Sequence, residues 1–422
     1  MERGNYINPS RSKKVSTYVK GERMFHEIDY KKSSAKPGET LHVTLPRVKD
    51  LVIVPGSFGL TFDMDIELDP AEPGSTVNTY PVNNLAANIV SKYVIKIGST
   101  IVYQLDYAHI YNTYADLWLS EKQRSNSIFK GIQEEELRKL RTDLGATISN
   151  PSASNVALRK IFGKRYCIPL KFEIIDDHMP LCTDDIEHDI TFEITINTKE
   201  YVLKYAKETA DFELKNLKLQ YEAIRDEALK HEIEGMLHDG MVFLYDHVHH
   251  YRVNEIPKKD TSVNVDIDGV DRRSLKGALL LFQSEFTAGQ RDSEHFPDPH
   301  IKNVIFTIDG LPTKVYNPCF QYLHQWNEIF KHFVPEEFKR SQDIHMDMHK
   351  YYGMNRYGFW IDLRSTEDNS IHGSGKKQES NKKIHMQVTK ENQGDGKYQM
   401  HIFLVSDARV LFQKKKFVSY EV

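Results

Sequence analysis

The side chains best suited to metal chemistry lie in one short run, Asp246-His-Val-His-His250, which is followed by Glu255. Side chains alternate between the two faces of a strand, so His247, His249 and Glu255 would share one face if this run is extended. Two imidazoles and a carboxylate are a ligand set that suits a divalent transition metal. This run is therefore the first candidate for a metal site.

The order glycine, His-x-His and glutamate in this region approximates the pattern of the cupins, a family of metal-dependent jelly-roll enzymes. The gaps from Gly240 to His247 and from His249 to Glu255 are each one residue too long for that pattern, and no downstream motif supplies a third histidine. We therefore expect these histidines to lie on a polar strand face or in an interface. A cupin-like metal-dependent enzyme stays open as an alternative function.

A second pair of histidines, His345 and His349, would share one face of a helix and could bind a metal from it. The Tyr351-Tyr352-Gly353 segment that follows fits a loop equally well. The His231-Glu232 pair lacks the second histidine of a metalloprotease helix, because position 235 is glycine. Neither pair gives a firm metal site.

Other catalytic signatures are absent from the sequence. It has no Gly-x-Ser-x-Gly elbow, no phosphate-binding loop with Gly-Lys-Ser/Thr and no cysteine pair with two residues between. Cys167, Cys182 and Cys319 read as small buried hydrophobes and are too few for a disulfide framework, which favours a reducing compartment. We therefore predict no catalytic, cofactor-binding or metal-binding residue and no cofactor, and we do not expect an enzyme.

The composition argues against several classes of protein. A chain of 422 residues is long enough for two or three domains, each with its own core. Its 60 acidic and 56 basic residues give a net charge of −4, which argues against a generically basic nucleic-acid coat. We expect no transmembrane span, because no run approaches about 20 apolar residues, and no signal peptide, because the N-terminus lacks an apolar stretch.

The first 36 residues read as a flexible basic arm. Five basic residues and a single acid, Glu2, lie within the first twenty positions. Such a segment is either a solvated tail or an arm that orders against a partner or a nucleic acid. The five basic residues are Arg3, Arg11, Lys13, Lys14 and Lys20.

Short runs with alternating hydrophobicity fill most of the first half. In Leu60–Leu68 the apolar residues occupy the even-numbered positions, which is typical of a strand with one buried face. An amphipathic helix is predicted at about Tyr107–Leu119, before a polar excursion at about 120–163. A second helix at about Asp226–Leu237 leads to Gly240, which we take as the boundary between two halves. The other predicted strands are Thr40–Pro46, Tyr93–Ile97, Thr100–Tyr103, Tyr166–Ile174, His188–Ile196 and Phe212–Ile224.

The second half repeats the order strand, tight turn, strand and helix. Ile97 and Ile308 are 211 residues apart, and Tyr103 and Tyr316 are 213 residues apart, which is half the chain. Matched elements at this spacing indicate that one unit has been duplicated. The predicted elements are strands Asn303–Ile308 and Thr313–Tyr316, a helix from Phe320 to Phe333, and strands Tyr357–Leu363, Lys383–Lys390 and Tyr398–Phe412.

About eight strands in each half fit a jelly roll, whereas an immunoglobulin-like domain does not carry such a helix between its strands. We therefore predict an all-β fold with short helices in its connections, a tandem double jelly roll. It consists of two eight-stranded antiparallel β-sandwiches standing side by side. The predicted division is the arm at 1–36, the first jelly roll at 37–239 and the second at 240–422.

The order and spacing of several runs resemble the major capsid proteins of Polinton/Maverick (adintovirus-type) elements, across roughly residues 40 to 290. The last third matches that family only in its strand–helix–strand layout. The runs that carry the resemblance are Leu51–Asp63, Val82–Leu85, Ile89–Lys92, Tyr111–Trp118, Arg124, Gly131-Ile132, Leu137–Arg141, Ile168–Leu170, Met179–Leu181 and Leu214–Tyr221.

The resemblance implies a hexon-type structural protein of the virion capsid. Its trimers would be pseudo-hexameric and would build an icosahedral shell around DNA, after synthesis in the host cytoplasm, with the nucleus as a further place of assembly. Implied partners are further copies of the chain, a penton protein and, for the N-terminal arm, packaged DNA. A carbohydrate- or receptor-binding protein with two sandwiches is a further alternative.

Overall fold

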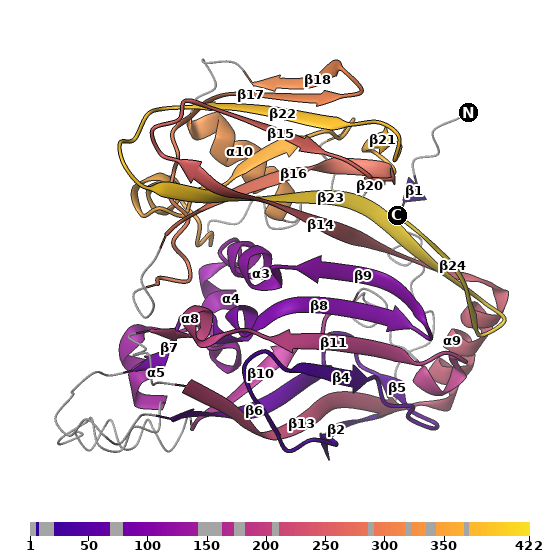
Figure 1. The fold of residues 1–422 in the computed structure, drawn as a ribbon. Helices are drawn as coiled ribbons and strands as arrows, with labels where there is room; N and C mark the ends of the chain where they lie inside the picture. The colour runs from indigo at the N-terminus through magenta and orange to yellow at the C-terminus, as the bar shows by residue number, and fades with distance from the viewer. Residues whose placement is uncertain are drawn as a thin grey trace.

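A computed structural model of the chain describes residues 6–7, 21–67, 79–141, 163–172, 182–204, 211–285, 291–316, 322–334, 343–366 and 371–422. These residues form two β-sandwiches that follow one another along the chain and are stacked in space (Figure 1). Among the described residues, no helix is both long enough and apolar enough to cross a lipid bilayer.

The first sandwich consists of two antiparallel sheets, with strand orders β10-β6-β13-β2 and β4-β11-β8-β9. Two short strands, β3 and β5, also pair with β13, and β7 pairs with β12 beside the sandwich. The strands are β2 (Glu22–Asp29), β3 (Ser34–Ala35), β4 (Thr40–Thr44), β5 (Val52–Ile53), β6 (Gly59–Glu67), β7 (Tyr80–Pro81), β8 (Val90–Ile97), β9 (Thr100–Asp106), β10 (Arg165–Pro169), β11 (Ile190–Ile196), β12 (Leu203–Lys204) and β13 (Asp211–Arg225).

The second sandwich has sheets of order β14-β23-β16-β19 and β15-β22-β17-β18. In addition, β21 pairs with β16, and β24 pairs with β23. Its strands are β14 (Met241–Pro257), β15 (Ser262–Ile267), β16 (Arg272–Ser284), β17 (Ile301–Ile308), β18 (Leu311–Tyr316), β19 (Phe359–Asp362), β20 (Ile371–His372), β21 (Lys376–Gln378), β22 (Ile384–Lys390), β23 (Lys397–Gln413) and β24 (Lys416–Glu421).

The helices lie in the connections between strands. Helix α3 follows β9, α10 follows β18, and α9 connects the two sandwiches (Figure 1). Their bounds are α2 (Leu85–Asn88), α3 (Ala108–Asp116), α4 (Glu121–Ser125), α5 (Glu135–Arg141), α8 (Lys199–Val202), α9 (Glu227–Asp239) and α10 (Tyr322–Phe333). The described parts of the predicted polar excursion, 120–141 and 163, contain α4 and α5.

The two sandwiches have the same topology. If the eight main strands of each are counted in chain order, both have one sheet of order 1-8-3-6 and one of order 2-7-4-5. This is the arrangement of a jelly roll. The predicted double jelly roll is therefore confirmed.

Local sequence features explain several of these elements. Strand β11 buries Ile190, Phe192, Ile194 and Ile196 and leaves the residues between them half-buried, as the alternating pattern predicts. Helix α9 begins after Asp226, whose side chain accepts hydrogen bonds from the backbone N–H groups of Ala228 and Leu229. The chain thus encodes its strands by hydrophobic alternation and its connecting helix by a capping residue.

The hairpins β8–β9 and β17–β18 share even an irregularity. Val102 in the first hairpin and Thr313 in the second are extra residues where the ladder shifts its register. This bulge fixes the spacing between equivalent positions at 313 − 102 = 211 residues along the hairpin. Lys314 is therefore the counterpart of Tyr103, and the predicted equivalence of Tyr103 with Tyr316 is wrong by two residues.

The strands also correct the extent of the N-terminal arm. The prediction assigned residues 1–36 to a flexible segment, but β2 and β3 lie within it and pair with β13 of the first sandwich. The sequence misled here because β2 is an edge strand, so most of its residues are exposed and charged or polar. Farther towards the N-terminus, β1 (Tyr6–Ile7) pairs with β20 of the second sandwich, and residues 1–5 and 8–20 lie outside the described residues.

Candidate functional site

The predicted metal-binding run lies on β14, but its three candidate ligands do not come together. Strand β14 has a register shift between Val253 and Ile256, and Glu255 lies within it with a φ of 57°. The Glu255 carboxylate forms an ion pair with Lys397 at 3.2 Å, whereas the His247 ring packs on Tyr103 with 5.6 Å between ring centroids. Among the described residues, no group of three His, Cys, Asp or Glu side chains could hold a metal ion.

The other candidate groups also have structural partners. His345 Nδ1 lies 2.8 Å from Glu121 Oε1, and His349 begins a separate single π-helical turn, so the two histidines do not share a helix face. Cys167 and Cys182 are buried, and burial raises the pKa of both thiols to about 12. Protonated thiols are poor nucleophiles and poor ligands. Cys319 lies outside the described residues.

A cluster of charged side chains in the second sandwich contains the residue types of a nucleophilic triad in the wrong order. Ser274 donates a hydrogen bond to Asp407, and His372 Nδ1 lies 3.1 Å from the same carboxylate. In a triad, the imidazole must contact the hydroxyl, whereas here the carboxylate lies between the two. Burial raises the pKa of Asp407, but His372 and the Lys276 ammonium outweigh it and lower that pKa to about 2. Lys276 Nζ also lies 2.8 Å from Asp246 Oδ1 on β14. The cluster therefore links β14, β16, β20 and β23 and is unsuited to nucleophilic catalysis.

The functional candidate that remains is the surface where the two sandwiches meet. Strands β9 and β14 lie side by side there (Figure 1). The Tyr245 hydroxyl on β14 donates a 2.6 Å hydrogen bond to the Val102 carbonyl on β9. Phe172 packs edge-on against the same tyrosine ring at 5.3 Å. An edge strand of each sandwich is therefore covered by the other.

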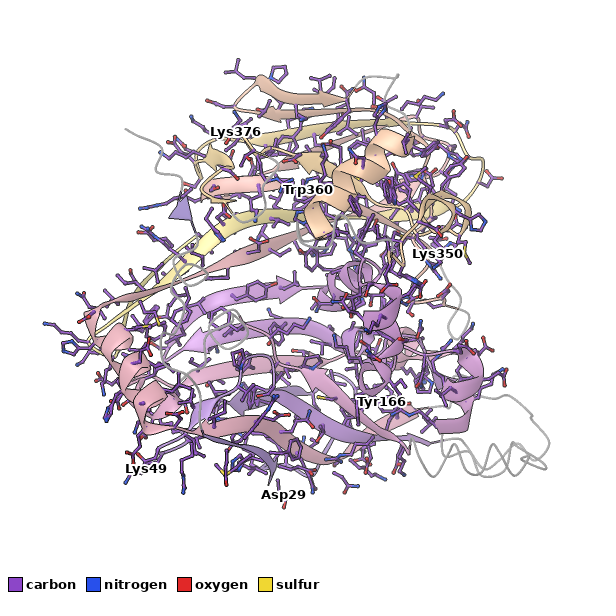
Figure 2. The ribbon with its side chains drawn as sticks, turned by 180° about the vertical axis from the view of Figure 1, so that it is seen from behind. Asp29, Lys49, Tyr166, Lys350, Trp360 and Lys376 are labelled. Atoms are coloured by element: carbon purple, nitrogen blue, oxygen red, sulfur yellow. The ribbon has the colours of Figure 1, made fainter. Side chains whose placement is uncertain are left out.

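The two equivalent helices, α3 and α10, meet at the same junction through aromatic side chains. Trp118, just beyond α3, stacks on Phe333 of α10 at 6.0 Å and also packs on Trp326 and Phe330. Figure 2 shows Trp360 beside α10, where its ring stacks on His332 at 3.7 Å. These rings form a continuous apolar contact between the sandwiches, of the kind that supplies large packing energies.

Another contact between the sandwiches, made by Tyr114, depends on a glycine at position 358. Tyr114 of α3 packs on Phe296 at 5.1 Å, and its hydroxyl donates a hydrogen bond to the Arg356 carbonyl. A Cβ atom on Gly358 would overlap the Tyr114 hydroxyl. The close approach of the first sandwich to the second therefore requires glycine at this position.

A histidine cluster occupies the interior of the junction. The His250 Nε2 and His401 Nδ1 atoms of the second sandwich are 3.0 Å apart. Tyr107 of the first sandwich packs on both rings, at 4.7 and 5.2 Å, while its hydroxyl accepts a hydrogen bond from Arg252. Burial lowers the pKa of His250 to about 4 and that of His401 well below its usual value. Both rings are therefore neutral at pH 7.

The cluster continues on the first sandwich with His109. Its ring is buried beside Tyr201 at 4.7 Å, and the guanidinium of Arg291 lies 4.5 Å above the Tyr201 ring. Burial lowers the pKa of His109 well below its usual value, and the charge of Arg291 adds to this effect. Sequence reasoning missed this cluster because its members come from segments far apart in the chain, with no motif in common.

Ion pairs close the two ends of the junction. Arg124 and Glu294 form a buried pair at 2.7 Å, and Glu294 also accepts a hydrogen bond from Asn83. Near the C-terminus, Lys415 pairs with Asp185 at 2.9 Å and Lys416 with Glu187 at 3.1 Å. Charged groups of the second sandwich thus bind partners in the first at both ends, which fixes their relative position.

Comparison with proteins of known structure identifies the fold. No family model matches the chain, and no curated protein matches it. Solved structures match over almost its full length at 7–10% sequence identity.

A chain of the Sputnik virophage structure aligns with a TM-score of 0.60 at 10% identity, covering 97% of this chain and 90% of that one. The Faustovirus major capsid protein gives 0.59 at 7% identity, with 95% and 92% covered. The mavirus major capsid protein gives 0.54 at 9% identity, with 98% and 93% covered. Two stacked jelly rolls joined by paired helices are therefore the double jelly-roll fold found in viral major capsid proteins.

Proposed function

We propose that this chain is the major capsid protein of a virus or virus-like element and has a structural role rather than an enzymatic one. The observation that carries the proposal is the fold itself: two jelly rolls of equal topology in one chain, matched over 95–98% of its length by the capsid proteins of Faustovirus and mavirus.

The duplication has a direct use in a shell. Three copies of a chain with two equivalent sandwiches give six similar lobes around one axis, and such a unit can pack hexagonally. The rigid junction supports this role, because the helices, ion pairs and buried histidines at the junction hold the lobes in one relative position. Each trimer would then be a rigid capsomer of an icosahedral capsid.

The finer assignments are proposals of the same kind. We place the first domain at 21–239 and the second at 240–422, since α9 ends at Asp239 and β14 begins at Met241. The Polinton/Maverick resemblance, a penton partner, enclosed DNA and assembly in the host cytoplasm or nucleus are consistent with this role. The basic residues within 1–20 suit contacts with packaged DNA or with a neighbouring capsomer.

Two other functions fit the residues less well. A cupin-like enzyme needs His247, His249 and Glu255 around one metal, but Glu255 pairs with Lys397 instead. A carbohydrate-binding protein would present clustered aromatic rings in its loops, whereas the aromatic rings of α3 and α10 pack against each other at the junction.

Light scattering of the purified full chain tests the proposal. A trimer of the 49.1 kDa chain has a mass of about 3 × 49.1 = 147 kDa. We expect this mass at micromolar concentration and physiological salt, because obligate interfaces of this kind commonly bury about 2,000 Å² or more. A monomer under these conditions would contradict the proposal.

A further inference from the structure

The contact between the two sandwiches of one chain indicates how two chains could contact each other. Inside the molecule, β9, the fifth main strand of the first sandwich, lies against β14, the first main strand of the second. By the shared topology, β18 is the counterpart of β9, and β2 is the counterpart of β14. The duplicated fold therefore offers a second contact of the same type, between β18 and β2.

These two strands cannot meet within one molecule. Strand β18 lies at one extreme of the stacked sheets, and β2 lies at the opposite extreme (Figure 1). Figure 2 shows Asp29, the last residue of β2, at the far end of the first sandwich from the second. A contact between β18 and β2 therefore needs two copies of the chain.

Strand β18 is an edge strand with exposed apolar side chains. Leu311 is 71% exposed and Val315 is 53% exposed. Their counterparts on β9, at the 211-residue spacing, are Thr100 and Gln104, which are half-buried. At these two positions, the strand that is covered within the chain carries polar residues and the strand that is open carries apolar ones.

Strand β2 shows the same property at the other end. It is the last strand of its sheet, Phe25 is 62% exposed, and Ile28 is 43% exposed. Long edge strands with apolar side chains are usually covered in stable proteins, because they otherwise pair with other chains. Its counterpart β14 is also an edge strand, and β9 covers it.

We propose that β18 of one copy packs against β2 of the next copy and repeats between molecules the contact that β9 and β14 make within each one. The contact joins two different surfaces, so it is head-to-tail, and it closes as a ring when three chains complete six sandwiches. Opposite charges accompany the apolar residues, since Lys314 lies on β18 and the 89%-exposed Asp29 side chain lies on β2. This inference rests on the proposed trimer and names the surface that forms it.

Two matched valine substitutions test the surface. Val315 on β18 and Val418 on β24 belong to outer strands of the second sandwich and are 53% and 51% exposed. Val315→Glu places a charge in the proposed contact, so we expect light scattering to change from the 147 kDa trimer to the 49.1 kDa monomer. Val418→Glu should remain trimeric, and circular dichroism should show a native fold for both variants.

The outcomes separate this inference from the proposed function. If the wild-type chain is monomeric, the proposed trimer itself is wrong. A wild-type trimer with a Val315→Glu variant that stays trimeric leaves the capsid role standing and overturns the β18–β2 contact. Loss of the trimer in both valine variants also counts against the named surface, because the effect would then not be specific to β18.

Cross-linking provides a second test that does not depend on disrupting the protein. In a Cys319→Ser background, a chain carrying both Phe25→Cys and Val315→Cys should give covalent dimers and trimers with a short bis-maleimide. Each single-cysteine variant should give none, because a head-to-tail contact brings two different residues together. Efficient cross-linking of Val315→Cys alone would indicate a symmetric contact of β18 with itself and would overturn the proposal.

Discussion

Strands β9 and β18 occupy the same place in the same fold, yet the first is covered and the second is open. In the first sandwich, the β9 edge meets β14, with Tyr245 bonded to its Val102 carbonyl. In the second, Leu311 and Val315 of β18 are exposed. Equivalent positions thus differ according to what covers them. Within the described residues, the edge strands β18 and β2 lack the contact that their counterparts β9 and β14 make with each other.

The helices that follow these strands behave in the opposite way. Helices α3 and α10 are also counterparts, but they pack against each other through Trp118, Phe330 and Phe333. Both helices are therefore covered at the junction, one from each sandwich. Substitutions at the junction should act on the stability of a single chain, whereas substitutions on β18 should act on association.

The largest effect is expected at Trp118, which is 5% exposed. Trp118→Ala should reduce the free energy of unfolding by about 3–5 kcal/mol, since it removes a large buried ring and leaves a cavity. Urea unfolding followed by circular dichroism measures this loss. Phe129→Ala is the matched control, because Phe129 is 65% exposed and should lose less than about 0.5 kcal/mol. Equal losses for the two variants would contradict the assigned junction.

A smaller effect is expected from pH. The folded state keeps His250 neutral and lowers its pKa to about 4, whereas the unfolded chain binds a proton at the usual value near 6.5. Stability should therefore be complete above about pH 6.5 and decrease as the pH falls towards 4. Between pH 7 and pH 5, the loss should be about 1–2 kcal/mol for this histidine.

Several charged groups face this histidine. Burial is the main cause of its lowered pKa, Asp106 opposes the shift, and His249 and Arg252 add to it. His401 contributes a second neutral ring, and its replacement in His401→Asn should make stability less dependent on pH. Melting temperatures of both proteins at pH 7 and pH 5 measure the difference. The same decrease in wild type and variant would mean that His401 does not contribute.

The smallest predicted effect concerns the bond between β14 and β9. Tyr245→Phe removes the hydroxyl that donates to the Val102 carbonyl and should cost about 1 kcal/mol of unfolding free energy. Tyr420→Phe, on the exposed strand β24, is the control, and we expect no measurable change there. Chemical denaturation of both variants distinguishes the covered surface from the open one.

Much of the fold could be predicted because hydrophobic alternation is local. Strands such as β6 and β11 alternate cleanly along the chain, and the repeated hairpin is visible from Ile97 and Ile308. The equivalence of Tyr103 with Tyr316 was misplaced by two positions, because these tyrosines share a residue type but not a place in the hairpin. Strand β2 was assigned to the arm because its exposed edge resembles a polar tail.

The junction was harder to predict, because it depends on contacts between distant segments. Tyr107, His250 and His401 meet only after both sandwiches have folded, and no spacing in the sequence links them. The His247, His249 and Glu255 pattern was a local signal of a metal site, yet the bulge in β14 directs Glu255 to Lys397. Periodicity predicts the face of a strand only while the register is unbroken.

Electron microscopy of the purified full-length protein tests the central claim most directly. If the chain is a capsid protein whose three copies join head-to-tail, class averages should show particles with three-fold symmetry, a hexagonal outline and six similar lobes. Two lobes of each particle should fit one chain, with β18 of every copy beside β2 of the next. Particles with only two lobes, or rings that are not three-fold, would contradict the account.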